Sequence, residues 1–179
     1  MAVEKTAGVE VRFAPDQPGT IAGYAAVWGR RDTFGDVVQR GAFTKTLAVH
    51  RAAGTRPLML WAHDPTKPIG TWTEMREDDT GLHVEGSLVL DSTQGRDAHA
   101  LLKAQALDGL SIGFRTVRAQ ATSGGGRIVH EMELIEISLV ARPAQAAARV
   151  SSIRSAPIHP AAAGVAAFIR ECAVKLRKS

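Results

Sequence analysis

Cysteine and long apolar segments are what this sequence lacks most clearly. Cys172 is the only cysteine among 179 residues. One thiol cannot form an intramolecular disulfide, so a reducing compartment is the simplest expectation. No run of about 18 apolar residues occurs, which excludes a membrane-spanning helix of ordinary length. The N-terminal segment from Met1 to Thr6 has no apolar signal core. These absences favour a soluble intracellular protein.

Metal-binding and nucleic-acid-binding patterns are also missing. None of the six histidines occurs at a metal-ligand spacing such as His-Glu-x-x-His, so we expect no metal ion and no cofactor. The net charge is +4, and much of the excess lies near the C-terminus, at Arg170, Lys175, Arg177 and Lys178. Aromatic residues do not accompany these basic residues. The pattern therefore does not favour nucleic-acid binding.

The sequence does contain a succession of strand-like segments. Alternating or short apolar runs predict strands at residues 9–13, 20–28, 57–63, from 69 onward, 82–90, 109–117 and 128–140. Pro65 and Pro68 are expected to break the third strand, 29–38 reads as a loop, and 77–81 as a turn. A helix is predicted at 41–53, ending at Gly54. A second is predicted after the candidate N-cap residues 91–93, with its apolar positions over 98–107. This order predicts a mostly β protein with inserted helices (α+β), closed or nearly closed into a barrel of about seven strands.

The composition changes after Pro143. Residues 144–163 are rich in alanine and include Pro157 and Pro160, whereas 164–178 have the pattern of a short basic amphipathic helix. The sequence therefore predicts one domain over residues 1–150 and a flexible basic tail over 151–179.

Ser111 is the first candidate catalytic residue. It lies in the strand-like run 108–114, between Gly109 and Gly113. Glycines weaken a strand, and here they are interpreted as making room for an extended substrate backbone. A serine hydroxyl needs a base within hydrogen-bond reach to act as a nucleophile. The alternative is a small residue in a packed strand.

His63 ends the apolar run 58–62 and is the candidate base. An imidazole can accept a proton near neutral pH. Asp64 is a poor candidate to orient it, because neighbours on a strand point to opposite faces. The alternative is a surface histidine where a strand meets a loop.

Glu136 is the most informative acid. With a period of two it shares a largely apolar face with Met132, Leu134, Ser138 and Val140. A carboxylate on such a face is expensive to bury unless it is paired. The partner is either an imidazole that becomes cationic during catalysis or a structural group such as an arginine. Glu133 is the alternative acid if the register is wrong.

Arg142 closes the last strand together with Pro143. Its guanidinium, or the backbone amides beside it, are candidates to stabilise an oxyanion. A surface arginine is the alternative interpretation.

Several motifs taken together resemble the prohead maturation proteases of tailed phages, over about residues 9–150. The motifs that carry the resemblance are Gly23–Trp28, Asp36–Val38 with Gly41–Phe43, Leu60–Asp64 with Pro68–Gly70, Asp108–Phe114, and Leu134–Val140 with Pro143–Ala144. The resemblance implies the herpesvirus assemblin-like fold, a β-barrel surrounded by helices. It also implies a serine endopeptidase that removes the scaffolding segment from the major capsid protein and often cleaves itself.

The resemblance places individual residues as well. His63 matches the family's histidine, Ser111 its nucleophile, and Glu136 the carboxylate of its Glu-x-Ser-Leu-Val motif. Arg142 falls near the arginine-bearing oxyanion loop of assemblins. Assemblins use a second histidine as the third member, where this chain has an acid.

The setting follows by the same resemblance. It implies action inside the assembling prohead in the cytoplasm of the bacterial host, and a homodimer or higher assembly. Similar proteases also occur in phage-derived gene-transfer particles. The alternative function is a catalytically silent capsid assembly or scaffolding factor with the protease fold, and a basic nucleic-acid-binding module rests only on the tail.

Overall fold

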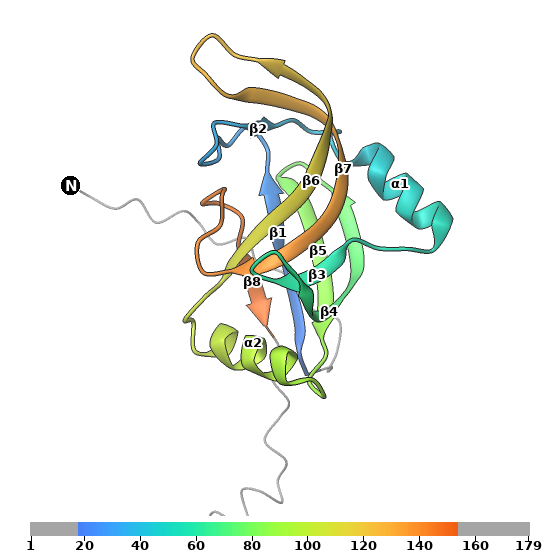
Figure 1. The fold of residues 1–179 in the computed structure, drawn as a ribbon, viewed down its shortest axis with the longest axis vertical. Helices are drawn as coiled ribbons and strands as arrows, with labels where there is room; N and C mark the ends of the chain where they lie inside the picture. The colour runs from blue at the N-terminus through green and yellow to red at the C-terminus, as the bar shows by residue number, and fades with distance from the viewer. Residues whose placement is uncertain (1–17, 154–179) are drawn as a thin grey trace, which may run out of the picture.

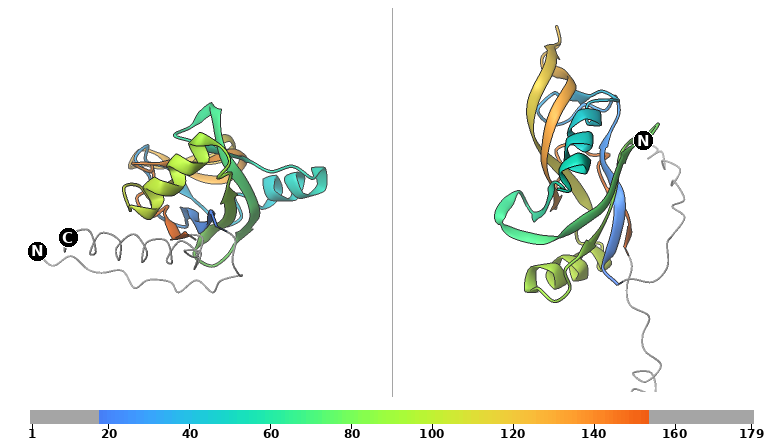
Figure 2. Two further views of the ribbon diagram at one scale, coloured as in Figure 1. Left: turned by 90° about the horizontal axis from the view of Figure 1, so that it is seen from below. Right: turned by 90° about the vertical axis from the view of Figure 1, so that its right-hand side faces the viewer.

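The structure is a computed structural model that describes residues 18–153 (Figures 1 and 2). Its elements follow in the order β1 (Thr20–Val27), β2 (Val37–Val38), α1 (Thr44–Ala53), β3 (Leu58–Trp61), β4 (Asp64–Glu77), β5 (Gly81–Leu88), α2 (Thr93–Lys103), β6 (Gly109–Ala121), β7 (Arg127–Val140) and β8 (Val150–Ile153). The predicted strand at 9–13 and almost all of the predicted tail lie outside the described residues. Neither helix in the described part is long and apolar enough to cross a membrane.

One sheet of eight strands organises the molecule. Its order is β2-β7-β3-β4-β5-β1-β8, with β6 paired to β7. The pairs of β7 with β2 and with β3 are parallel, and the other pairs are antiparallel. The long β6–β7 hairpin extends beyond the other strands at the top of Figure 1. The mostly β architecture with two inserted helices is thus as predicted.

The predicted closed barrel is wrong, because the observed sheet is open. Among the described residues, only a few backbone hydrogen bonds connect the start of β6 with the segment that leads into β8. Leu110 N donates to Ala148 O at 3.0 Å and Val150 N donates to Asp108 O at 2.7 Å, around an isolated bridge between Gly109 and Arg149. After this point β6 pairs only with β7 among the described strands, so no continuous ladder of hydrogen bonds joins β6 to β8 and closes the sheet.

The prolines after His63 do not break a strand, contrary to the sequence prediction. β4 begins at Asp64 and contains both Pro65 and Pro68. In this first part β4 pairs only with β3, through a register that shifts twice, and its pairing with β5 starts at Gly70. An edge with an irregular register tolerates the missing amide of proline.

Other boundaries differ by a few residues. The predicted loop 29–38 contains the short strand β2, and α1 begins at Thr44 rather than at 41. The second helix, α2, is capped within the predicted 91–93 segment, because the Ser92 side chain accepts a hydrogen bond from Gly95 N. It ends at Lys103, before the predicted end at 107.

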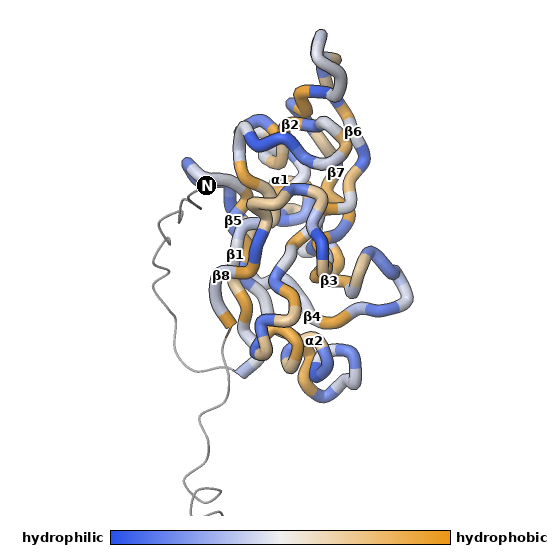
Figure 3. The backbone as a smooth tube through the Cα atoms, turned by 90° about the vertical axis from the view of Figure 1, so that its left-hand side faces the viewer, coloured by the Kyte–Doolittle hydropathy of each residue, from blue (hydrophilic) through white to orange (hydrophobic). Residues whose placement is uncertain are grey.

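The core lies between the sheet and the two helices. In Figures 1 and 2, α1 lies beside β7 and α2 lies at the lower end of β4 and β5. In Figure 3, hydrophobic and hydrophilic residues are interspersed along the tube. The largest fully buried side chains are those of Trp72, Phe43, Ile21, Met59, Ile69, Leu82 and Leu110. This core gives β3, β6 and β7 a fixed relative position, on which the site below depends.

Candidate active site

Strand register brings the polar residues of β6 and β7 to one place. Ser111 on β6 pairs with Ser138 on β7, and Gly113 pairs with Glu136. Residues two apart on a strand share a face, so Glu136 and Ser138 lie on the face that carries Ser111. β3 runs parallel along the other edge of β7, with Trp61 opposite Leu139. The chain that follows β3 therefore emerges beside Ser138.

His63 lies in the tight turn between β3 and β4, not in the strand that the sequence predicted. Trp61 pairs with Asp64, so Ala62 and His63 form a two-residue connection. Both have positive φ angles, 50° and 63°, the pattern of a type I′ turn. The left-handed region costs a non-glycine residue about 1–2 kcal/mol. Ala62 N donates to Leu139 O at 3.0 Å, which holds the turn against β7.

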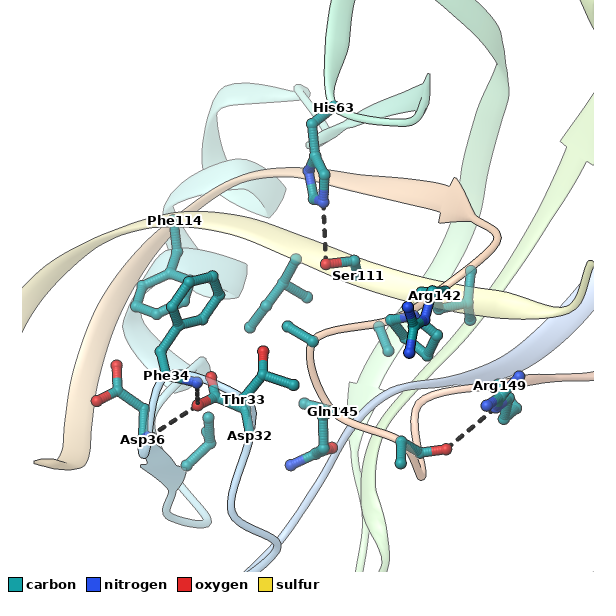
Figure 4. A pocket seen from close by; sticks show the side chains of 18 of the residues that line it. Asp32, Thr33, Phe34, Asp36, His63, Ser111, Phe114, Arg142, Gln145 and Arg149 are labelled. Atoms are coloured by element: carbon teal, nitrogen blue, oxygen red, sulfur yellow. Dashed lines mark hydrogen bonds between the residues drawn. The ribbon is translucent and has the colours of Figure 1, made fainter. Parts of the chain in front are cut away.

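The three predicted residues meet in a chain of two hydrogen bonds. His63 Nδ1 lies 2.5 Å from Glu136 Oε1. His63 Nε2 lies 3.0 Å from Ser111 Oγ, the contact marked by a dashed line in Figure 4. An ionised carboxylate can only accept, so Nδ1 carries the proton and Nε2 is left to accept from the serine hydroxyl. Ser111 and Glu136 are only 6% and 7% exposed, whereas the imidazole is nearly half exposed. This arrangement can remove a proton from Ser111.

Glu133, the alternative acid, is not part of this group. It lies on the other face of β7, and its carboxylate forms an exposed ion pair with Arg115 Nη1 at 2.5 Å. Glu136 in turn has no arginine partner among the contacts of the described chain. Its carboxylate oxygens bind His63 and Ser138. The register assumed from the sequence is therefore the observed one.

Gly109 and Gly113 have a different reason to be glycine from the one predicted. A Cβ atom on Gly113 would overlap the side chain of Glu136, and one on Gly109 would overlap the carbonyl of Val140 and the ring of Pro143. Neither glycine belongs to the residues that line the cavity beside Ser111 in the described structure. In this structure they make room for the protein's own atoms.

A cavity of about 1010 Å³ opens beside Ser111 and His63. Its walls come from β6, from the loop before β2, and from the segment after β7; they include Leu110, Ile112, Phe114, Asp32, Phe34, Arg142 and Gln145. In the view of Figure 4, Phe34 and Phe114 lie to one side of Ser111 and Arg142 to the other. Arg142 is exposed and has no ion pair or hydrogen bond among those of residues 18–153. It is free to meet a ligand.

Side-chain contacts that the sequence did not predict hold the cavity walls in place. Gln145 Oε1 accepts from Val27 N at 2.6 Å, and its amide donates to Val27 O and Arg30 O. Asp36 is nearly buried and forms a two-point ion pair with Arg127, at 3.0 and 2.5 Å. Arginine and glutamine side chains 90 or more residues from their partners carry no local sequence signal for these contacts.

The described residues contain no group of three His, Cys, Asp or Glu side chains that could hold a metal ion.

The sequence matches a family profile and several known proteins. The profile of the caudovirus prohead serine protease family matches residues 7–160. The prohead protease of Enterobacteria phage HK97 is 30% identical over 151 residues, which cover 82% of this chain and 65% of that protein. The prohead protease of Escherichia phage T5 is 28% identical over 114 residues, covering 63% of this chain and 53% of that one. The chain thus matches about half to two thirds of the length of these relatives.

A third relative and a solved structure extend the comparison. The capsid polyprotein of Pseudomonas phage PAJU2 is 30% identical over 156 residues, which cover 82% of this chain and 22% of that protein. The structure of the bacteriophage T4 capsid assembly protease, gp21, superposes with a TM-score of 0.58 at 17% identity, over 74% of this chain and 88% of that one. At this identity the T4 structure shows a shared fold. The match over residues 7–160 shows that this chain belongs to the caudovirus prohead serine protease family.

Proposed function

We propose that this protein is a serine endopeptidase that cleaves the scaffolding segment from the major capsid protein, and itself, during prohead maturation. The observation that carries the proposal is the hydrogen-bonded chain from Ser111 through His63 to Glu136. Membership of a prohead protease family supports the capsid protein as the substrate. The reaction then takes place inside the assembling prohead in the host cytoplasm, where the protease acts as a homodimer or higher assembly.

The chemistry is acyl transfer in two halves. Ser111 Oγ attacks the scissile carbonyl carbon as its proton passes to His63 Nε2, and the imidazolium then gives this proton to the leaving amine. Water hydrolyses the acyl-enzyme with His63 again as the base, which regenerates the Ser111 hydroxyl. Glu136 keeps the imidazole oriented and stabilises its positive charge through the 2.5 Å contact.

The oxyanion is assigned to the segment after β7. Arg142 and the backbone amides beside it line the cavity on which Ser111 opens. Such donors stabilise the negative charge that develops on the carbonyl oxygen. The exposed position of Arg142 leaves its guanidinium available for this role.

The substrate is assigned to the free edge of β6. β7 pairs with one edge of β6, and after the bond from Leu110 N to Ala148 O the other edge has no strand partner among residues 18–153. Ile112 and Phe114 on this part of β6 line the cavity. An extended polypeptide can add to such an edge through backbone hydrogen bonds. Its scissile carbonyl would then lie beside Ser111.

Co-expression with the cognate capsid protein tests the proposal. Wild type and Ser111→Ala are compared by intact-mass spectrometry of both chains in assembled particles. We expect a defined truncation of the capsid protein with wild type only, and labelling of Ser111 by a fluorophosphonate. If wild type cuts neither chain in assembled particles, the protein is instead a catalytically silent assembly factor with the protease fold.

A further inference from the structure

Ser138 has a buried hydroxyl at the centre of the site that the mechanism above does not use. Its side chain is on the same face of β7 as Glu136, directly opposite Ser111, and the residue is 0% exposed. Ser138 Oγ donates to Glu136 Oε2 at 2.7 Å and accepts from His63 N at 3.0 Å. Ser111, His63 and Glu136 are called the triad below. One hydroxyl therefore contacts both the acid and the base of this triad.

The first contact fixes the carboxylate of Glu136. Rotation about the last bond of a glutamate side chain is only weakly restricted by its own geometry. His63 holds Oε1 and Ser138 holds Oε2, so the two together set the plane of the carboxylate. Without the hydroxyl, Oε2 would be a buried charged oxygen that lacks its one donor among the described side chains, which is costly.

The second contact fixes the backbone of His63. This residue has a positive φ of 63°, which residues other than glycine rarely adopt, and it belongs to a two-residue turn. A strained conformation persists only where surrounding contacts determine it. The amides of Ala62 and His63 are both held by β7, through Leu139 O and Ser138 Oγ. The hydroxyl thus opposes relaxation of the turn that aims the imidazole at Ser111.

We propose that Ser138 is a positioning residue, whose hydroxyl couples the backbone of His63 to the carboxylate of Glu136 and so holds the two in register with Ser111. This inference rests on the proposed peptidase function for its kinetic consequence. Its structural consequence, a fixed bond between His63 and Glu136, is independent of the substrate.

The test uses full-length Ser138→Ala and Ser138→Thr with the capsid protein as substrate. Small misplacement of a catalytic group lowers rates by up to about 10²-fold, so we expect Ser138→Ala to lower kcat by roughly 10- to 100-fold with KM nearly unchanged. Ser138→Thr keeps a hydroxyl and should restore most of kcat. Proton NMR should show a far-downfield His63 Nδ1–H signal in the wild type that is shifted or lost in Ser138→Ala.

Thr46→Val is the matched control. Thr46 is also buried, and its hydroxyl accepts a hydrogen bond from Leu134 N of β7 at 3.1 Å, but it makes no hydrogen bond to Ser111, His63 or Glu136 among the described contacts. This variant should lose stability but keep kcat and the downfield signal, which separates positioning from a general loss of packing. If Ser138→Ala does not fold, Ser138→Cys takes its place, since a thiol is a weak donor and acceptor in nearly the same volume.

Two results would overturn the inference: wild-type kcat in a folded Ser138→Ala, or an unchanged His63 proton signal in that variant. A wild-type protein that cleaves nothing would instead remove the proposed function. In that case the NMR comparison alone decides whether Ser138 positions the pair.

Discussion

Glu136 and Glu133 lie three positions apart on β7 but have opposite environments. Glu136 is nearly buried against His63, and Glu133 is paired with Arg115 at the surface. The buried carboxylate can stabilise an imidazolium, because a short contact in a poorly solvated site strengthens the attraction between opposite charges. The exposed one has no contact with the triad. Chemistry at the residue scale therefore depends on which face of the strand carries the acid.

Replacing Glu136 by glutamine should impair catalysis without removing it. In Glu136→Gln the side chain keeps its size but has no charge to stabilise the imidazolium, so we expect kcat to fall by about 10²-fold or more. Single-turnover cleavage of the capsid protein measures the effect. Glu133→Gln is the control, since it removes an equal charge from the same strand and should stay within about twofold of wild type. The reverse pattern would move the acid to Glu133.

Gly113 should be intolerant of even one methyl group. Because a Cβ atom there overlaps the side chain of Glu136, Gly113→Ala should displace the carboxylate, lower kcat and destabilise the fold by about 1–3 kcal/mol. Kinetics and denaturant unfolding together measure both effects. Gly124→Ala is the matched control, because the added methyl meets no atom within 4 Å and Gly124 lies in the β6–β7 turn. Equal behaviour of the two variants would contradict this account of Gly113.

At the scale of elements, the loop before β2 presents an aromatic side chain to the cavity. Phe34 is 80% exposed, yet its loop is well anchored. Asp32 Oδ1 accepts from Phe34 N and Asp36 N at 2.9 and 2.8 Å, and Thr33 N donates to Ala144 O at 2.9 Å. A rigid loop that holds a phenylalanine in solvent is poised to bury it against a bound chain.

Phe34→Ser should therefore weaken substrate binding and leave the triad intact. Burial of a phenylalanine contributes about 1.5–3 kcal/mol, so we expect kcat/KM for the capsid protein to fall roughly tenfold or more, mainly through KM. The rate of fluorophosphonate labelling at Ser111 should not change. Val117→Ser, at an exposed position on β6 outside the cavity lining, is the control. Unchanged KM in Phe34→Ser would show that the substrate does not contact this loop.

The elements also show what could be predicted from the sequence. The sequence predicts Ser111 and Glu136 as site residues, because alternation along β6 and β7 assigns each residue to a face of its strand. The sequence indicates His63 as the end of an apolar run, but it does not indicate the turn, since Ala62-His63 is not one of the Asn-Gly, Asp-Gly or Gly-Gly pairs that mark a type I′ turn. The roles of Ser138, Gly113 and Gln145 arise only where segments meet: Ser138 is 75 positions from His63 and Gln145 is 118 from Val27. The alternation within a strand shows which face each residue lies on, but it does not show which residues of other segments that side chain contacts.

At the scale of the whole molecule, β1, β4 and β5 meet in a second polar cluster far from the triad. Tyr24 OH donates to Asp78 Oδ2 at 2.9 Å, and Trp28 Nε1 donates to Asp78 O at 2.8 Å, so β1 is tied to the turn between β4 and β5. His83 is buried beside Tyr24 in an edge-to-face arrangement, and its Nδ1 has no hydrogen-bond partner among residues 18–153. Because these strands form the centre of the sheet, protonation here acts on the stability of the entire fold.

The protein should lose stability in two steps as the pH falls. Burial, and then the nearby Arg76, lower the pKa of His83 below 6.5, although Glu85, Asp78 and Glu74 act in the opposite sense. The unfolded chain therefore takes up a proton on His83 at a higher pH than the folded protein does, so stability falls as the pH drops below about 6.5.

The second step comes from two aspartates. Hydrogen bonds from Thr66, then Lys67, lower the pKa of Asp64 from 3.8 to about 2. For Asp78, burial alone would raise the pKa, but hydrogen bonds from Gly81, Thr80 and Tyr24 outweigh it. Both carboxylates stabilise the fold above about pH 3.8 and lose this contribution below it.

His83→Phe separates the two steps. The substitution keeps an aromatic ring next to Tyr24 and removes both the titrating group and the unpaired Nδ1, so stability at pH 7.5 should stay within about 1 kcal/mol of wild type. Between pH 6.5 and 5 the wild type should become less stable while the variant does not, and both should weaken below pH 4 through the aspartates. Urea unfolding across this range measures the difference. Parallel curves for the two proteins between pH 6.5 and 5 would show that His83 takes up no extra proton on unfolding, and would place the acid sensitivity of the sheet elsewhere.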